Sequence, residues 1–286
     1  MPNGNYSMNK DTLPDIGIVA VEEINGLSIR YAQSGPLSGF PILLTAPWPE
    51  SIYSFHLLAP VLSKKHRVIL VDLPGFGLSQ SRPDLMSPEA MGNFLIDIFK
   101  HFKIGRTHIV APDVGTPAAL FAASEHERYF ESLVIGGAAM QPDLAAGALK
   151  DLIHSPAGSL QDAGSDGVRS YLEQASILTP AAIIEDFRSA SSGARLEEAA
   201  QFVRGYIHDL PKLEPRLNKI HTPTLIIAGR NDPIVPPINA EFLSKRLPNC
   251  GSILLDAEHR VWEEAADDYN KAIDSWFSGE YLRQKH

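Results

Sequence analysis

Residues 109–120 read IVAPDVGTPAAL: a short apolar run, then Pro112 and Asp113, then Gly115 and an alanine-rich stretch. An apolar run that ends in a tight turn before helix-forming residues predicts a strand–turn–helix unit. A sharp turn of this kind lifts the side chain at its tip above the sheet, as in a nucleophile elbow. The residue at the tip is usually serine, but here it is Asp113.

Apolar runs similar to 109–111 recur along the chain and alternate with helical stretches. An opening hairpin is expected at 16–24 and 27–35, and strands buried on both faces at 41–46, 66–75, 107–111, 132–137, 223–229 and 252–257. Helices are expected at 51–63, 87–102, 116–127, 238–247 and 267–277. This alternation predicts an α/β fold with a mostly parallel central sheet flanked by helices.

The alternation stops between residues 138 and 215, where no strong strand signal occurs. Helical runs at 146–154, 167–178, 180–190 and 195–210 fill this stretch, and Gly- and Ser-rich joints separate them. We interpret the stretch as a helical cap over the carboxyl ends of the strands, where open α/β sheets bind ligands. The predicted organisation is a core domain of residues 19–137 and 216–280, a cap domain of residues 138–215, and a flexible leader of residues 1–18.

The composition excludes several classes of protein. The 286 residues are 44% hydrophobic and 21% charged, an ordinary globular composition. A net charge of −9 argues against a nucleic-acid partner, and no apolar run has membrane-spanning length. Cys250 is the single cysteine, which excludes an internal disulfide and fits a cytoplasmic location. No pattern in the sequence indicates an oligomeric state.

Two further polar residues each follow an expected strand. Asp232 lies in GRNDPIVPP after the run 223–229, and His259 lies in DAEHRVW after the run 252–257. Each candidate has an ordinary explanation: a helix N-cap for Asp113, a turn for Asp232 and a surface histidine for His259. The order nucleophile, acid, histidine, with each residue at the end of a strand, favours a catalytic unit.

An oxyanion site is expected beside this unit. The segment LLTAPWPES (43–51) leaves a strand directly into a Pro-rich turn, which is placed to bring the Trp48 N–H beside that of Val114. Two N–H groups that point to one position stabilise developing negative charge. Without the turn at Asp113, the same segment would be read as a tight turn with a packed tryptophan.

From about residue 19 to residue 277, these segments resemble the α/β-hydrolase superfamily. VILVDLPGFGLSQ (68–80) resembles the family's strand and loop that lead toward the elbow. TPTLIIAGRNDPIVPP (222–237) and HRVWEEAADDYNKAIDSWF (259–277) are similar to its acid and histidine segments. The resemblance implies an α/β-hydrolase fold, with a helical cap inserted into the core.

The aspartate at the elbow resembles the Asp-nucleophile branch: epoxide hydrolases, haloalkane dehalogenases and fluoroacetate dehalogenases. This resemblance implies that Asp113 attacks an electrophilic carbon and forms an alkyl-enzyme ester. His259, oriented by Asp232, would then activate the water that hydrolyses the ester. A carboxylate is ionised at neutral pH, so it needs the histidine only for this second step.

The segment PWPES (47–51) favours an epoxide as the substrate, because it resembles the His-Gly-x-Pro motif of epoxide hydrolases. Many dehalogenases have a halide-binding Asn there, or a Trp directly after the nucleophile; this chain has Trp48 and Val114 at those positions. An epoxide hydrolase also needs acidic donors from the cap. Tyr206, on the last cap helix, is the better candidate by position, and Tyr171 is the other; packing explains each of them equally well.

The chain departs from the family pattern at three places. Ala46-Pro47 replaces His-Gly, Pro112 replaces a common His before the nucleophile, and Glu258 replaces the Gly often found before the base. Proline lacks an N–H and restricts the preceding residue, so the oxyanion loop is expected to differ in shape. A tailoring enzyme that acts on a particular hydrophobic metabolite would fit these departures.

Other functions stay open at this point. A haloalkane or haloacid dehalogenase is the alternative within the same branch. A C–C or ester hydrolase similar to meta-cleavage-product hydrolases normally needs serine at the elbow, and a cofactor-free base catalyst would use His259 alone. A ligand-binding receptor on this fold would need none of the three residues. No cofactor or metal is expected, because no close helical pair of histidines and no nucleotide-binding signature occurs.

Overall fold

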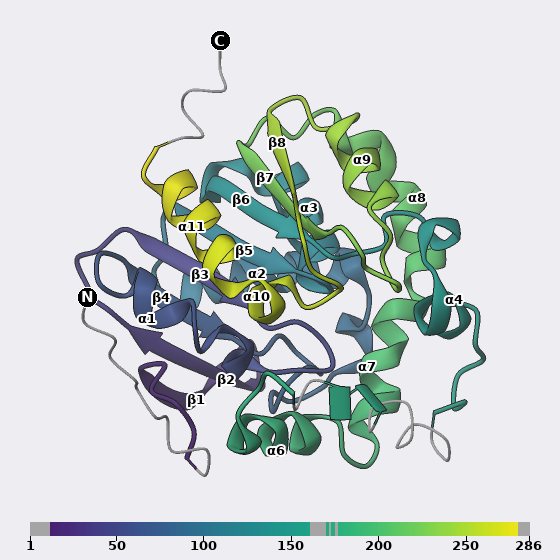
Figure 1. The fold of residues 1–286 in the computed structure, drawn as a ribbon, viewed down its shortest axis with the longest axis horizontal. Coiled ribbons are helices and arrows are strands. Elements are labelled where there is room, and N and C mark those ends of the chain that lie inside the picture. The colour runs from purple at the N-terminus through teal and green to yellow at the C-terminus, as the bar shows by residue number, and fades with distance from the viewer. Residues whose placement is uncertain (1–11, 161–169, 172, 175–176, 280–286) are drawn as a thin grey trace.

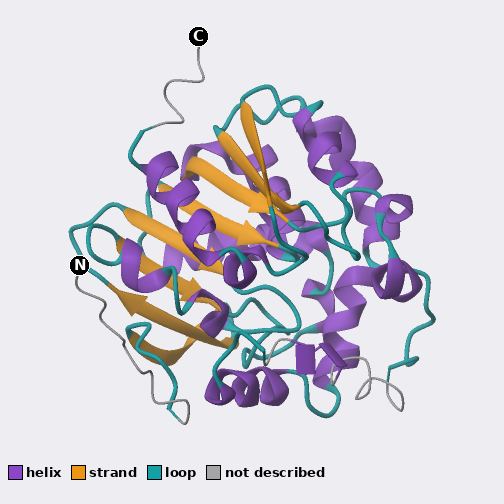
Figure 2. Ribbon diagram, viewed as in Figure 1, coloured by secondary structure: helices purple, strands orange, loops and turns teal. Residues whose placement is uncertain are grey.

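An eight-stranded sheet forms the centre of the molecule, and helices pack on both of its faces (Figure 1, Figure 2). The computed structural model describes residues 12–160, 170–171, 173–174 and 177–279. The strands are β1 Ile18–Ile24, β2 Leu27–Ser34, β3 Pro41–Thr45, β4 Arg67–Val71, β5 Thr107–Pro112, β6 Phe130–Gly136, β7 Thr224–Gly229 and β8 Cys250–Leu255.

The strand order in the sheet is β1-β2-β4-β3-β5-β6-β7-β8. The β1–β2 and β2–β4 pairs are antiparallel, and every later pair is parallel. The predicted hairpin and mostly parallel sheet are therefore confirmed. Because β3 to β8 run in one direction, the loops at their carboxyl ends meet along one edge of the sheet.

The central strands are apolar without interruption because both of their faces are covered. In β3, Leu43 joins the buried cluster under α2 and α3, whereas its neighbours Ile42 and Leu44 join the cluster under α1 and α11. The prediction that both faces are buried was wrong for β8. This strand lies at the sheet edge, and Leu254 is 36% exposed.

The helices largely follow the predicted ranges. They are α1 Ala59–Leu62, α2 Pro88–His101, α3 Gly115–His126, α4 Gly147–Ile153, α6 Ala181–Ala190, α7 Arg195–Arg204, α8 Tyr206–Leu217, α9 Ile238–Ser244, α10 Val261–Glu264 and α11 Ala266–Phe277, with short 3₁₀ helices at Ile52–Phe55, Pro83–Leu85, Glu127–Tyr129 and Pro142–Leu144.

Two predicted helices are each divided in the structure. The range 51–63 consists of the 3₁₀ helix Ile52–Phe55 and the single turn α1, and Pro60 has no N–H with which to continue the earlier turn. The range 195–210 is divided at Gly205, where α7 ends and α8 begins. This division makes Tyr206 the first residue of α8.

The chain between β6 and β7 contains only helices and connecting loops in its described residues, which gather at one side of the sheet (Figure 1). This arrangement agrees with a helical insertion. Residues 1–11 of the predicted leader and part of the predicted helix 167–178 lie outside the described residues. Within the described ranges, no helix is both long and apolar enough to cross a membrane.

Candidate active site

Asp113 lies at the tip of the turn between β5 and α3, as the sequence predicted. Its φ of 53° is in the left-handed region, which Asp adopts more readily than most residues. The turn is fixed on both sides, since the Asp113 N–H donates to the Gly136 carbonyl (2.8 Å) and the Thr116 N–H donates to the Asp113 carbonyl (2.9 Å). Gly115 is required as well, because a Cβ there would lie 2.1 Å from Thr45 Oγ1.

The carboxylate of Asp113 is held by the predicted oxyanion donors. The Trp48 N–H donates to Asp113 Oδ2 at 2.7 Å, and the Val114 N–H also favours the ionised form. Burial raises the pKa of Asp113 to about 6, although the His259 charge and both N–H groups oppose the rise. At neutral pH, the carboxylate is therefore mostly ionised, with one oxygen held by the β3 loop.

His259 and Asp232 form a second pair. His259 Nδ1 lies 2.7 Å from Asp232 Oδ2, and Asp232 Oδ1 accepts hydrogen bonds from the Ile234 and Val235 N–H groups, both at 2.8 Å. Burial alone would lower the pKa of His259. The hydrogen bond and charge of Asp232, with the Asp113 charge, outweigh burial and raise this pKa to about 9.

Gly137, which follows β6, lies between the nucleophile candidate and the base candidate. A Cβ at Gly137 would be 3.8 Å from both the Asp113 nitrogen and His259 Cε1. The fold therefore brings the three residues predicted from separate strands to one place. With Nδ1 bound to Asp232, the other ring nitrogen of His259 is available to a water or a substrate.

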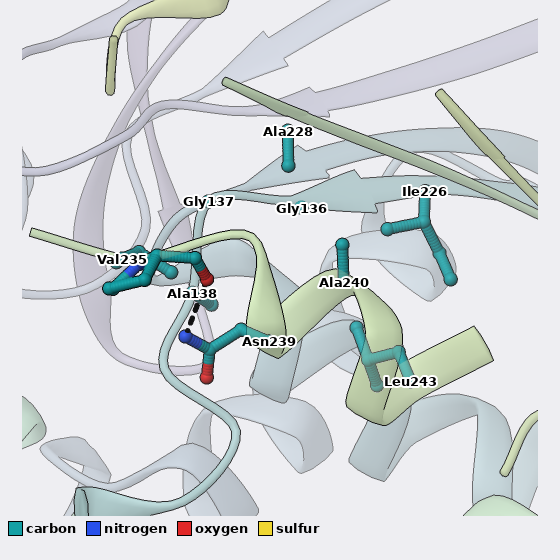
Figure 3. A pocket seen from close by; sticks show the side chains of 10 residues that line it. Gly136, Gly137, Ala138, Ile226, Ala228, Val235, Asn239, Ala240 and Leu243 are labelled. Carbon is teal, nitrogen blue, oxygen red and sulfur yellow. Dashed lines mark hydrogen bonds between the residues drawn. The ribbon is translucent and has the colours of Figure 1, made fainter. Parts of the chain in front are cut away.

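A narrow pocket extends from this glycine turn toward α9 (Figure 3). It is lined mainly by apolar groups: Gly136, Gly137 and Ala138 after β6, Ile226 and Ala228 of β7, and Val235, Pro236, Asn239, Ala240 and Leu243 near α9. Its volume of about 10 Å³ is no more than one water requires. This pocket is therefore too small to be the substrate site.

The two cap tyrosines differ in their contacts. Burial raises the pKa of both phenols, and the Asp113 charge contributes to each rise, so both lie within its electrostatic reach. Tyr206 is 2% exposed, and its hydroxyl has no hydrogen-bond partner among the described residues. The Tyr171 hydroxyl instead donates to Glu50 Oε1 at 2.6 Å.

Glu50 and Arg260 were not predicted as site residues, but both lie beside the candidate triad. Glu50 is fully buried, and its charge raises the pKa of both Asp113 and His259. Arg260 follows the histidine directly, and its Nε donates to Glu50 Oε1 at 2.8 Å. The available signal was a glutamate inside a short Pro-rich turn beside the expected oxyanion donor.

The three departures from the family pattern leave the main contacts of the site in place. Pro47 precedes Trp48, whose N–H still reaches the carboxylate of Asp113. Pro112 is the buried last residue of β5. Glu258 is exposed, and its N–H donates to Glu264 Oε2 at 2.6 Å. The missing backbone donors are therefore not those that hold Asp113.

Comparison with known proteins places this arrangement in a family. The family model for the alpha/beta hydrolase fold matches residues 41–266. The chain belongs to this family and is a hydrolase of the α/β fold. The strand order of the sheet and the helices between β6 and β7 agree with that membership.

Individual relatives are distant and differ in activity. The chain is 28% identical over 112 residues to a soluble epoxide hydrolase of Corynebacterium sp. strain C12, covering 39% of this chain and 38% of the relative. It is 26% identical over 272 residues to a 2-hydroxy-6-oxononadienedioate/2-hydroxy-6-oxononatrienedioate hydrolase of Burkholderia vietnamiensis, covering 88% and 92%. The solved structure of epoxide hydrolase CorEH superposes with a TM-score of 0.77 at 18% identity, covering 91% of this chain and 98% of that one.

Proposed function

We propose that the protein hydrolyses an epoxide of a hydrophobic small molecule, with Asp113 as the nucleophile. One observation carries the proposal: the Trp48 N–H binds Oδ2 of a buried carboxylate at the tip of the elbow. A backbone donor aimed at one carboxylate oxygen leaves the other to attack carbon. The same donor can later hold the oxyanion that forms when the ester is hydrolysed.

In the first step, an Asp113 oxygen attacks an epoxide carbon, the carbon–oxygen bond breaks, and the leaving oxygen takes a proton from a cap tyrosine. In the second step, water attacks the ester carbonyl while His259 accepts one of its protons. The tetrahedral oxyanion lies against the Trp48 and Val114 N–H groups. Its collapse releases the diol, which takes up a proton from His259, and leaves Asp113 as a carboxylic acid. This acid passes its proton through water to the cap tyrosinate formed in the first step, which restores both the carboxylate and the phenol.

The charges around His259 support this division into two steps. The negative charge of Asp113 contributes to the raised pKa of His259. Ester formation removes this charge, so the pKa of His259 falls when the histidine must act as a base. Asp232 keeps the ring oriented throughout, because its hydrogen bond to Nδ1 does not depend on the ester.

The substrate class rests on the cap and on the partial match to the soluble epoxide hydrolase. An alkoxide is a poor leaving group without a proton, and Tyr206 has an unpartnered hydroxyl near Asp113. The partners proposed are a hydrophobic small molecule and water, in the cytoplasm, with no cofactor.

The test is the intact mass of the His259→Gln variant after incubation with a panel of epoxides and alkyl halides. Without the base, attack continues while ester hydrolysis stops. We expect an adduct of the full epoxide mass, localised to the peptide that contains Asp113. The matched control is the His259→Gln/Asp113→Asn variant, which should stay unmodified. An adduct that persists in this control, or no adduct in a folded His259→Gln protein, would contradict the proposal.

A further inference from the structure

Glu50 accepts hydrogen bonds from four side chains, one nearby in the sequence and three from distant parts of the chain. Its Oε1 receives the Tyr171 hydroxyl (2.6 Å) and Arg260 Nε (2.8 Å). Its Oε2 receives Trp262 Nε1 (3.0 Å) and the Ser54 hydroxyl. Four donors fill the acceptor positions of a carboxylate, so Glu50 has none left to take a proton from a substrate or a water.

This network contacts Tyr171 at its hydroxyl and over its ring. Its hydroxyl binds Glu50, and the Arg260 guanidinium lies 5.9 Å from the centre of its ring. Arg260 also binds the Thr179 hydroxyl at 2.7 Å, and Thr179 donates to Glu263 Oε2 at 2.6 Å. The cap segment around Tyr171 and Thr179 is thereby tied to the loop that carries His259.

The direction of the Tyr171 proton matters for the chemistry. A phenol has a single proton, and Tyr171 gives it to Glu50, so only the lone pairs of its oxygen remain for other partners. Tyr206 donates no hydrogen bond to another described residue. It packs in the same buried cluster as Val114, the residue after Asp113, and the Asp113 charge contributes to the raised pKa of its phenol. The two tyrosines are therefore not equivalent donors.

On the basis of the proposed function, we infer that Glu50 is a positioning residue that draws the Tyr171 proton away from Asp113 and leaves Tyr206, of these two tyrosines, as the acid. Tyr206 then gives its proton to the epoxide oxygen as the Asp113–carbon bond forms and the carbon–oxygen bond breaks. The Tyr206 phenolate regains, through water, the proton that the Asp113 carboxyl releases once the ester is hydrolysed. At pH 8 Asp113 is ionised even with its pKa raised to about 6, so in the His259→Gln protein Glu50 acts through Tyr171 and touches no reacting atom.

The experiment measures the rate of adduct formation at pH 8 in the His259→Gln protein with an epoxide that labels it. Into this protein we introduce Tyr206→Phe, Tyr171→Phe, Glu50→Gln and the Tyr171→Phe/Glu50→Gln pair. Tyr206→Phe should slow labelling by about 100-fold or more, as for loss of a general acid. Tyr171→Phe should slow it by less than about 5-fold, because its proton is not used in the reaction.

Glu50→Gln tests the positioning role directly. It should change the labelling rate when residue 171 is Tyr and leave it unchanged when residue 171 is Phe, a coupling that general loss of stability would not produce. Equal slowing by the two Tyr→Phe variants, or the same effect of Glu50→Gln in both backgrounds, would overturn the inference. If Glu50→Gln does not fold, the comparison of Tyr171→Phe with Tyr206→Phe still decides it. Failure of the parent His259→Gln protein to label would instead count against the proposed function.

Discussion

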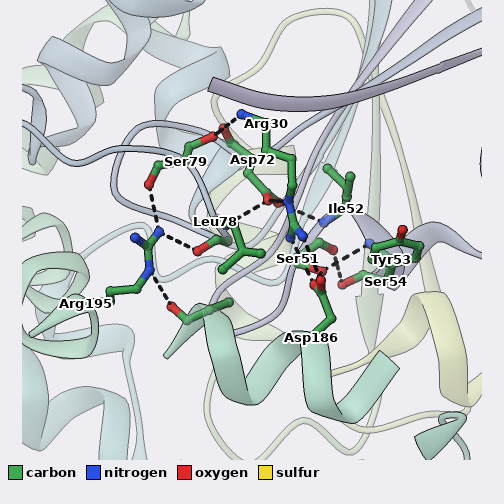
Figure 4. A network of polar contacts seen from close by, with 12 residues as sticks. Arg30, Ser51, Ile52, Tyr53, Ser54, Asp72, Leu78, Ser79, Asp186 and Arg195 are labelled. Carbon is green, nitrogen blue, oxygen red and sulfur yellow. Dashed lines mark hydrogen bonds and ion pairs between the residues drawn. The ribbon is translucent and has the colours of Figure 1, made fainter. Parts of the chain in front are cut away.

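Two buried networks of charged side chains join the helices between β6 and β7 to the strand loops, and they differ in their relation to Asp113. The first network, around Glu50 and Arg260, lies beside Asp113, and the charge of Glu50 raises the pKa of that carboxyl. The second network centres on Arg30 of β2, which pairs with Asp72 after β4 and with Asp186 of α6 (Figure 4).

The contacts of the Arg30 network hold helices α6 and α7 against the loops of the sheet. Arg30 binds both oxygens of Asp186, at 2.7 Å and 3.0 Å, and the Ser51 hydroxyl binds the same carboxylate. On α7, Arg195 donates to the carbonyls of Gly77 and Ser79 at 2.6 Å and 2.7 Å. Similar buried ion pairs therefore have different consequences. The Glu50 charge changes the pKa of Asp113, the proposed nucleophile, whereas the Arg30 contacts join α6 to β2 and to the loop after β4.

The largest expected effect is on Asp113 itself. Asp113→Asn keeps a residue that tolerates the left-handed backbone, but it removes the nucleophilic charge, so turnover should fall by about 10⁴-fold or more. Stability should rise at pH 7. The pKa of Asp113 is about 6 in the folded protein, above its ordinary value of 3.8. Ionisation of this carboxyl therefore lowers the stability of the folded protein as pH rises from 3.8 to about 6, and the loss is complete at pH 7. Steady-state turnover should fall while the thermal unfolding temperature at pH 7 rises, and these two measurements check the prediction.

A smaller effect, on stability rather than chemistry, is expected in the Arg30 network. Asp186→Asn removes the charge that pairs with Arg30 and should lower the free energy of unfolding by about 1–3 kcal/mol. The matched control is the neighbouring residue of α6: Glu185→Gln breaks an exposed pair with Arg188 and should cost no more than about 0.5 kcal/mol. Urea unfolding measures both values. Loss of adduct formation when Asp186→Asn is added to folded His259→Gln protein would contradict the separate roles of the two networks.

The smallest expected effect is a shift in pH dependence. The rate of ester formation should rise with pH through about 6 as Asp113 ionises. Because the Glu50 charge raises the pKa of Asp113, Glu50→Gln should move the midpoint of this rise to lower pH, whereas Asp186→Asn should leave it in place. Single-turnover rates between pH 5 and pH 8 compare the three proteins. The same shift in both variants would contradict the separate roles of the two networks.

Local signals explain how much of the fold was predictable. Apolar runs predicted the strands, and the apolar run before Asp113 with Gly115 after it predicted the turn. The reason for glycine at 115, its close approach to Thr45 of β3, is a tertiary contact that the local pattern does not contain. Asp113, Asp232 and His259 could be combined into one predicted site because the carboxyl ends of parallel strands lie at the same end of the sheet. The exposed β8 was not predicted, since a strand's place at the sheet edge is a property of the whole topology.

The contacts of the site depended on tertiary packing that no local pattern contains. Glu50 and Arg260 are 210 residues apart in the chain, and Arg30 and Asp186 are 156 apart. Tyr171 was a candidate by position alone, and only its contact with Glu50 shows where its proton points. The sequence favoured Tyr206 over Tyr171 by its position, but it could not show which partner each hydroxyl has.

The most direct test of the central claim is a single turnover of the wild-type protein in H₂¹⁸O, with enzyme in excess over a labelling epoxide. If Asp113 forms an ester, the oxygen added to the diol comes from the carboxylate and the water oxygen stays on Asp113. An Asp113 ester therefore predicts an unlabelled diol and ¹⁸O in the peptide that contains Asp113. A diol that carries ¹⁸O after one turnover, with Asp113 unlabelled, would mean that water attacks the substrate directly and would contradict the account.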